Sequence, residues 1–166
     1  MVVAVRRGTS SDMELLSSLD AEVHAIHAAA LPWAFKSPGP PAFPPDKAAE
    51  LMDNPDNLVF IAEIDAEPVG CIWAGVVRRA ETPWRPAREM VYVNLISVRA
   101  AHRRRGVGAA LMAAVRAEAA SRNVALLGLD VWSFNADARA FFQSQGFAPY
   151  NERLWSRVGE AGRERA

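Results

Sequence analysis

The chain has 166 residues, which is about the size of one domain. Apolar residues make up 51% of it and charged residues 23%, a composition that supports a buried hydrophobic core and excludes global disorder. The 19 Lys and Arg balance the 19 Asp and Glu, so net charge favours neither nucleic acid nor an anionic membrane as a partner.

The cysteine content and the hydropathy of the chain indicate the cellular compartment in which the protein works. Cys71 is the only cysteine, which excludes an internal disulfide and suits a reducing environment. The chain has no stretch of the roughly 18 apolar residues that a membrane span needs. We therefore predict a cytoplasmic protein that binds neither membrane nor nucleic acid.

The N-terminal part predicts a strand, a helix and a loop. Residues 2–6 are apolar and mostly β-branched, which predicts a short strand. Ser11 and Glu14 have the spacing of a capping box, and apolar residues then recur at helical spacing to about residue 27. Six prolines in residues 31–45 exclude a regular helix, and the aromatic residues among them indicate an ordered loop.

The middle of the chain predicts a short helix and three strands. The helix is expected near residues 46–53. Residues 58–64 and 69–77 are strand-like and flank an acidic, proline-containing turn, so we predict a β-hairpin. A third strong strand is predicted over residues 90–98.

The last part of the chain is predicted to alternate between helix and strand. An alanine-rich segment has helical periodicity over 107–121, and a strand is predicted over 126–132. Asn135 is predicted to cap a short helix that stops at Gly146. A final strand is predicted over 149–158. We expect one domain over residues 1–158 and a frayed charged tail over 159–166.

The segment most informative about function joins the strand 90–98 to the helix 107–121. Glycines at the start of a helix let an anion approach the unpaired backbone N–H groups, where the helix dipole is positive. Gly106 and Gly108 open this helix, and Arg103, Arg104 and Arg105 precede them. This pattern suits a pyrophosphate, although a solvated basic loop explains it equally well. Neither a Walker loop nor a dinucleotide fingerprint is present.

Two motifs carry a family resemblance. Arg103-x-x-Gly106-x-Gly108, after the strand that ends Leu95-Ile96-Ser97-Val98, resembles the acyl-CoA-binding motif of the GCN5-related N-acetyltransferase (GNAT) superfamily. Asn135-x-x-Ala138-x-x-Phe141-Phe142-x-x-x-Gly146-Phe147 resembles the second conserved block of that family. The resemblance covers roughly residues 2–158.

The resemblance implies a mixed α/β fold: a central splayed, mostly antiparallel sheet with helices on both faces. Acetyl-CoA is the implied co-substrate, with its pantetheine arm paired to the backbone around Ile96 and Val98. The implied cofactor-binding residues are Ile96, Val98, Arg103, Arg104, Arg105, Gly106, Val107, Gly108, Ala109, Asn135 and Phe142.

The catalytic residues implied by the resemblance are sparse. Phe142 stands where family members often carry the tyrosine that protonates the leaving thiolate, so the usual acid is absent. Tyr92 and Asn94 occupy the inward positions from which the family draws its general base, and neither is a good base at pH 7. Glu89, just before the strand, is chemically better suited, but we favour its interpretation as a solvated loop residue. Ser133 and Tyr150 are the nearby hydroxyls in sequence.

Other polar and aromatic residues remain open. The resemblance implies that the first helix and its loop wall the acceptor site, so His24, His27, Trp33 and Phe35 are expected there, in plain packing or at the exposed surface. The two histidines lack carboxylate or cysteine partners at ligand spacing, and we predict no metal. Cys71 is expected in the core, and His102 is expected to face solvent.

These expectations lead to two functions. The first is N-acetyl transfer from acetyl-CoA to a primary amine of a small molecule or peptide, by direct attack in a ternary complex. The second is a non-catalytic acyl-CoA-binding or regulatory domain, which the absence of a tyrosine at Phe142 favours. The sequence leaves the acceptor amine open, and a homodimer is expected only because it is common in the superfamily.

Overall fold

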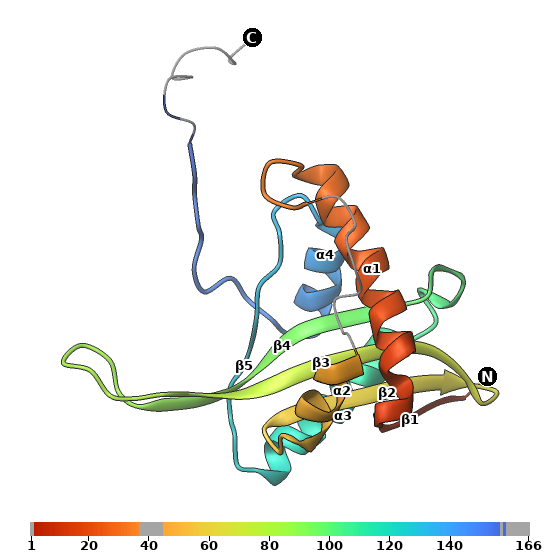
Figure 1. The fold of residues 1–166 in the computed structure, drawn as a ribbon. Helices are drawn as coiled ribbons and strands as arrows, with labels where there is room; N and C mark the ends of the chain where they lie inside the picture. Colours follow the sequence, from red (N-terminus) through yellow and green to blue (C-terminus); the bar gives the residue numbers. More distant parts are fainter. Residues whose placement is uncertain (1, 37–44, 157, 159–166) are drawn as a thin grey trace.

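The computed structural model describes residues 2–36, 45–156 and 158. Their strands form one sheet in the order β1-β2-β3-β4-β5, which Figure 1 shows as a twisted layer. Strands β1 to β4 pair antiparallel, and β5 pairs parallel with β4. The strands are β1 (Val3–Arg7), β2 (Asn57–Ile64), β3 (Glu67–Arg79), β4 (Arg88–Val98) and β5 (Leu127–Leu129). The predicted mixed, mostly antiparallel sheet is confirmed.

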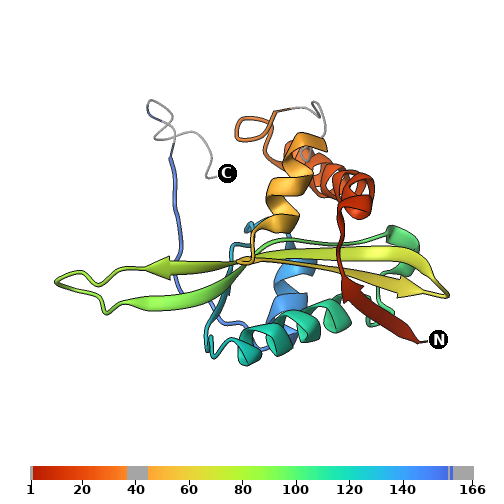
Figure 2. The same ribbon diagram turned by 60° about the horizontal axis from the view of Figure 1, so that its bottom comes forward.

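Helices cover both faces of this sheet, as predicted. Figure 2 shows α1 and α2 on one side and α3 and α4 on the other. Their bounds are α1 (Met13–Ala30), α2 (Pro45–Asp53), α3 (Val107–Ser121) and α4 (Ala136–Ser144), with 3-10 turns η1 (Ser10–Asp12) and η2 (Ala100–His102). Within the described residues no helix has the length and apolar character needed to cross a membrane.

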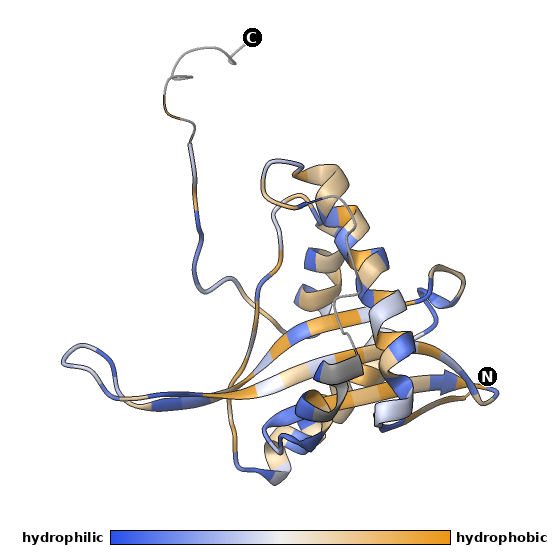
Figure 3. Ribbon diagram, viewed as in Figure 1, coloured by the Kyte–Doolittle hydropathy of each residue, from blue (hydrophilic) through white to orange (hydrophobic). Residues whose placement is uncertain are grey.

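The sheet separates two hydrophobic cores because successive side chains on a strand point to opposite faces. In β2, Leu58 and Phe60 pack toward α3, whereas Val59 and Ile61 pack toward α1. We call the first cluster the α3–α4 core; it includes Ile72, Val91, Val93, Val107, Leu111, Met112, Val115 and Phe142. The second is the α1–α2 core, formed by Met13, Leu16, Leu19, Leu51, Val59, Ile61, Cys71 and Leu95. Figure 3 shows that apolar residues follow the centre of the sheet, whereas the projecting end of the β3–β4 hairpin is hydrophilic.

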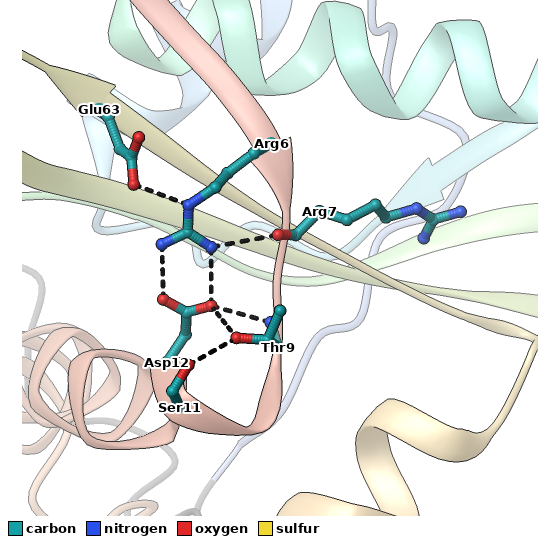
Figure 4. Close-up of polar contacts among 6 residues, drawn as sticks. All are labelled: Arg6, Arg7, Thr9, Ser11, Asp12 and Glu63. Carbon is teal, nitrogen blue, oxygen red and sulfur yellow. Dashed lines mark hydrogen bonds and ion pairs between the residues drawn. The ribbon is translucent and has the colours of Figure 1, made fainter. Parts of the chain in front are cut away.

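An arginine network fixes the start of α1. The Arg6 guanidinium donates twice to the Asp12 carboxylate, at 2.8 Å each, and once to Glu63 on β2, at 2.7 Å (Figure 4). The Thr9 backbone N–H also donates to Asp12, at 2.8 Å. Asp12 therefore takes the acidic position that sequence spacing assigned to Glu14, so the predicted Ser11–Glu14 capping box is wrong.

Most predicted elements lie within one or two residues of their observed bounds. The predicted hairpin turns at Asp65 and Ala66, which have positive φ of 52° and 64°. The predicted helix 107–121 coincides with α3. Asn135 caps α4 by accepting from the Ala138 N–H at 3.1 Å, and Gly146 follows α4 with φ 83°.

Two strand predictions require correction. The predicted strand 126–132 contains only the short β5, because the chain leaves β4 after Leu129. The predicted strand 149–158 is wrong over its described residues, since 148–156 belong to no strand or helix. A strand needs a backbone neighbour, and Figure 1 shows this segment leading away from the sheet. The loop residues 37–44 and the tail 159–166 lie outside the described residues.

Candidate functional site: the fork between β4 and β5

The sheet opens between its last two strands. The parallel pairs run from Val91 opposite Leu127 to Val93 opposite Leu129, and the pairing ends there. Strand β4 nevertheless continues to Val98, paired only with β3 on its other side. We call this opening the fork; beyond it one edge of β4 has no strand neighbour among the described residues. The splay that the sequence resemblance implied is confirmed.

A β-bulge lies immediately beyond the last pair of the fork. Trp73 is opposite Leu95 and Ala74 is opposite Val93, so Asn94 is an extra residue on β4. An extra residue reverses the alternation of side chains between faces. Val91 and Val93 accordingly belong to the α3–α4 core and Leu95 to the α1–α2 core. Ile96 and Val98 return to the α3–α4 side, where they are half-buried.

The loop after β4 leads from the fork to the start of α3. Arg103 folds back along it, and its Nε donates to the Val98 carbonyl at 3.0 Å. Two backbone positions have positive φ, Arg104 at 61° and Gly106 at 82°. Gly106 is the N-cap residue of α3, and no side chain of a described residue caps this helix. The first N–H groups of α3 are therefore available to a ligand, as a helix N-terminus offers them to an anion.

The glycines of this turn have different surroundings. A Cβ built on Gly106 meets nothing within 4 Å, so the space beside it is open. A Cβ on Gly108 would lie 3.0 Å from the Phe141 ring of α4. Gly108 thus permits close packing of α3 on α4, while buried Val107 anchors the turn in the core. Ala109 is half-buried beside them.

The three arginines differ in their partners. A guanidinium nitrogen of Arg103 lies 4.0 Å from a carboxylate oxygen of Glu22 on α1. Arg104 and Arg105 are exposed and make no hydrogen bond or ion pair with any described residue. Their positive charge is therefore available beside the uncapped end of α3.

The two candidate base positions lie at the fork. Burial, followed by a hydrogen bond to Asp130, raises the pKa of Tyr92 to about 12. Asn94 is exposed, and its Nδ2 donates to the Tyr92 carbonyl at 3.4 Å. Neither side chain is a strong proton acceptor at neutral pH.

The other candidate acids and bases are engaged elsewhere. Phe142 is 7% exposed, and its ring lies 5.2 Å from that of Phe141 and 5.7 Å from that of Phe147. Glu89 lies in β4 rather than in a loop, is half-buried and pairs with Arg78 of β3 at 2.8 Å, so its interpretation as a solvated loop residue is corrected. The Tyr150 hydroxyl accepts from Arg88 at 3.4 Å, and this contact lowers the pKa of Tyr150. Ser133 is exposed.

An aromatic cluster joins the C-terminal end of α1 and the turn after it to the segment that follows β5. The rings of His27 and Phe35 stack with centroids 5.1 Å apart, and Phe35 meets Trp132 edge-on at 4.9 Å. Trp132 and Phe134 belong to the segment after β5. We call His24, His27, Phe35, Trp132 and Phe134 the fork cluster. Trp33 instead contacts Trp155, with centroids 4.1 Å apart.

Sequence reasoning found three of the five residues of this cluster. It singled out His24, His27 and Phe35, but it missed Trp132 and Phe134. The available signal was the presence of two aromatic residues in the short connection between a strand and the cap residue Asn135.

The remaining candidates have structural surroundings. Cys71 is fully buried, as predicted, and burial raises its pKa to about 12. His102 is half-buried rather than solvent-facing, and its Nδ1 is buried without a partner among the described residues. His102 ends the 3-10 turn η2, and its backbone N–H donates to the Arg99 carbonyl at 2.9 Å. No group of three or more potential metal ligands occurs in the described part of the chain, and the absence of a metal stays a prediction.

Comparisons with known proteins agree with this geometry. A model described as the acetyltransferase (GNAT) family matches residues 21–147. No curated protein sequence matches the chain. A mutant of the BH1408 protein from Bacillus halodurans is 21% identical, with a TM-score of 0.88 over 93% of this chain and 99% of that one.

Two further solved structures have different descriptions. AAC(6')-Iy, solved with a CoA-containing bisubstrate analogue, is 20% identical, with a TM-score of 0.73 over 95% of this chain and 98% of its own. A transcriptional regulator from Bacillus halodurans is also 20% identical, with a TM-score of 0.70 over 95% of this chain and all (100%) of its own. At these identities the similarity establishes the fold.

Proposed function

The chain belongs to the acetyltransferase (GNAT) family, and we propose that it transfers the acetyl group of acetyl-CoA to a primary amine of a small molecule or peptide. One observation carries this proposal: the open edge of β4 leads directly to the uncapped start of α3. An open strand edge suits an extended arm with amide groups, and a helix N-terminus suits phosphates. A molecule with both parts, in that order, is a coenzyme A thioester.

The residues at the start of α3 fit such a ligand. Open space beside Gly106 allows a phosphate to approach the backbone closely. The exposed side chains of Arg104 and Arg105 supply positive charge, and Arg103 holds the loop against the end of β4. We assign the pantetheine arm to the backbone of Ile96 and Val98, and the pyrophosphate to the backbone from Arg104 to Ala109. Asn135 and Phe142 complete the proposed set from α4.

The proposed reaction is direct acyl transfer. The nitrogen of the free amine attacks the thioester carbonyl carbon, a C–N bond forms, the C–S bond breaks, and CoA departs as a thiolate that takes up the proton lost by the attacking nitrogen. Holding the amine against the thioester at the fork supplies much of the rate by proximity and orientation. The bulge at Asn94 frees backbone groups where the thioester would lie, and Tyr92 and Asn94 line the same place as proposed polar contacts.

Of the two proposed acceptors, a small molecule or a peptide, the comparisons favour the small molecule. AAC(6')-Iy is described as an aminoglycoside N-acetyltransferase, so a similar fold serves a small amine there. In this chain the proposed acceptor wall is the fork cluster. We further propose that residues 1–158 act as one acetyltransferase domain, whereas the homodimer and the cytoplasmic location stay predictions.

The test measures CoA binding and acetyl transfer separately. Acetyl-CoA and CoA should raise the melting temperature, whereas ATP and NAD at equal concentration should raise it much less. Free thiol should then appear from acetyl-CoA only when an amine is added from a panel of arylalkylamines, polyamines, amino acids and aminoglycosides. Absence of any shift with CoA would overturn the assignment of the site.

Two observations favour a non-catalytic alternative, in which the chain binds acyl-CoA without turnover. Phe142 has no proton to give a leaving thiolate, and one similar structure is described as a transcriptional regulator. Binding of CoA without thiol release across the amine panel would support this alternative.

Substitution of Phe142 by tyrosine tests the missing acid. We expect turnover to rise by less than about tenfold, because a thiolate of pKa about 8.5 leaves readily and the ring is buried beside Phe141 and Phe147. Steady-state thiol release measures the effect. A rise of roughly 100-fold or more would mean instead that thiolate departure limits the rate.

A further inference from the structure

Helix α1 reaches across the sheet to the fork. Leu16 and Leu19, in its first half, pack in the α1–α2 core with residues of β2, β3 and β4. Two turns later, His27 contacts Trp132 and Phe134, which follow β5. Because its two halves contact opposite sides of the opening, α1 brings His27 to the place where β4 and β5 part. Figure 1 shows the C-terminal end of α1 beside the chain that leaves β5.

The His27 ring is held by aromatic contacts and not by hydrogen bonds. It stacks on Phe35, and it meets the Phe134 ring edge-on at 5.6 Å and the Trp132 ring at 6.1 Å. Neither ring nitrogen makes a hydrogen bond with any described residue, and neither is a fully buried orphan. His24 differs, since its Nε2 lies 2.8 Å from the Lys36 carbonyl oxygen and must donate to it. His27 therefore has a fixed ring, and neither of its nitrogens has a hydrogen-bond partner in the described part of the chain.

Burial and nearby charges together determine the pKa of His27. Burial among the rings lowers the pKa of His27, repulsion by His24 lowers it further, and the Asp20 carboxylate opposes both. The remaining charged groups on the elements packed against it are Lys36 after α1 and Asp130 after β5. A neutral imidazole at pH 7 is a competent proton acceptor.

We propose that His27 accepts the proton that the acceptor ammonium must lose before it attacks acetyl-CoA, an inference that rests on the proposed function. The ammonium N–H bond breaks, its proton goes to a ring nitrogen of His27, and the nitrogen lone pair attacks the thioester carbon. The amide nitrogen loses its second proton to the departing thiolate, so CoA leaves as a thiol. The imidazolium releases its proton to solvent before the next turnover.

Other groups at the fork are poorer acceptors. Tyr92 is held as a phenol by burial and Asp130. Asn94 does not titrate, and Glu89 is paired with Arg78 outside the fork. Asp20 is the strongest competitor, since burial raises its pKa. Asp20 directly follows Leu19, which packs with Cys71 of β3 in the α1–α2 core, whereas His27 contacts the segment after β5.

The test is the pH dependence of kcat/KM with one amine, because the titration of that amine is then the same for every variant. His27→Phe keeps an aromatic ring against Phe35 and removes both nitrogens. We expect kcat/KM to fall roughly 100-fold. We also expect the pH profile to lose its acidic limb, which is the decrease in kcat/KM at low pH that protonation of His27 causes. CoA-induced thermal stabilisation should stay unchanged, because the variant leaves the cofactor path intact.

Two neighbouring variants should move the same limb in opposite directions. Activity falls as pH drops through the pKa of the base, because the base must be unprotonated. Asp20→Asn removes a charge that favours imidazolium, so the limb should move to lower pH. His24→Gln removes a repelling charge, so the limb should move to higher pH, each shift being roughly half a pH unit.

The outcomes separate this inference from the function on which it rests. If the wild-type protein acetylates no amine, the proposed function fails. If the wild type is active and His27→Phe keeps the acidic limb, the His27 inference alone is overturned. Loss of the limb in Asp20→Asn, in place of a shift, would assign the base to Asp20 and would likewise overturn it.

Discussion

Replacing Gly106 by valine should abolish the thermal stabilisation that CoA and acetyl-CoA give. Gly106 has φ 82°, a conformation that a β-branched residue adopts only with strain. Its missing Cβ also leaves open the space through which a phosphate would approach α3. At 100 times the Kd, bound ligand stabilises by about 2.7 kcal/mol, so the loss is easily measured by thermal unfolding.

Gly146 provides a matched control for this strain. It follows α4 with φ 83°, and a Cβ there also meets nothing within 4 Å. Gly146→Val should therefore cost about 2 kcal/mol of stability, as Gly106→Val does, yet keep the response to CoA. An equal loss of the CoA response in both variants would contradict the assignment of Gly106 to the phosphate site.

Replacing Asp12 by asparagine should destabilise the fold more than loss of any exposed ion pair. Asp12 is 7% exposed and binds both Arg6 and the Thr9 N–H, as Figure 4 shows. The Arg6 side chain is 40% exposed, so we expect a cost of about 2 kcal/mol, below that of a fully buried pair. Asp56→Asn is the control, because the Asp56–Arg78 pair is exposed and should contribute under about 1 kcal/mol.

The pH dependence of this effect has a definite sign. The hydrogen bond from Arg6, above all, lowers the pKa of Asp12. A carboxyl with a lowered folded-state pKa stabilises the protein fully above its unfolded value of about 3.9, and the contribution is lost as pH falls through the folded pKa. The difference in unfolding free energy between wild type and Asp12→Asn should be constant from neutral pH to about 5 and should shrink below about 4. A difference that persists undiminished at pH 2 would show that the charge of Asp12 is not its source.

Local chemistry explains why much of the site was predictable from sequence. Helix α3 could be placed because its alanine-rich periodicity depends on neighbours three and four residues apart. The cap at Asn135 and the left-handed Gly146 follow equally from local backbone chemistry. The glycine–arginine turn predicted an anion site for the same reason, since a helix start offers its N–H groups whatever surrounds it.

Partner-dependent features were not predictable in this way. Residues 149–158 have the composition of a strand, but pairing requires a neighbouring backbone, and the described part of that segment lies away from β5. The fork cluster joins α1, the turn after it and the segment after β5, which are brought together only by the crossing of α1 over the sheet. The residues next to His27 in the sequence give no indication that its ring contacts Trp132 and Phe134.

The bulge at Asn94 is the clearest case of what tertiary structure alone decided. In sequence, residues 90–98 read as one continuous alternation, which would put Ile96 and Val98 on the same face as Tyr92 and Asn94. One extra residue opposite β3 reverses that parity, so Ile96 and Val98 pack with Val93 on the α3–α4 side. The sequence by itself determined that β4 is a strand leading to a glycine–arginine turn at the start of a helix. Pairing with β3 decided which residues of β4 lie on the α1–α2 side and which on the α3–α4 side, because the register of a strand depends on its neighbour.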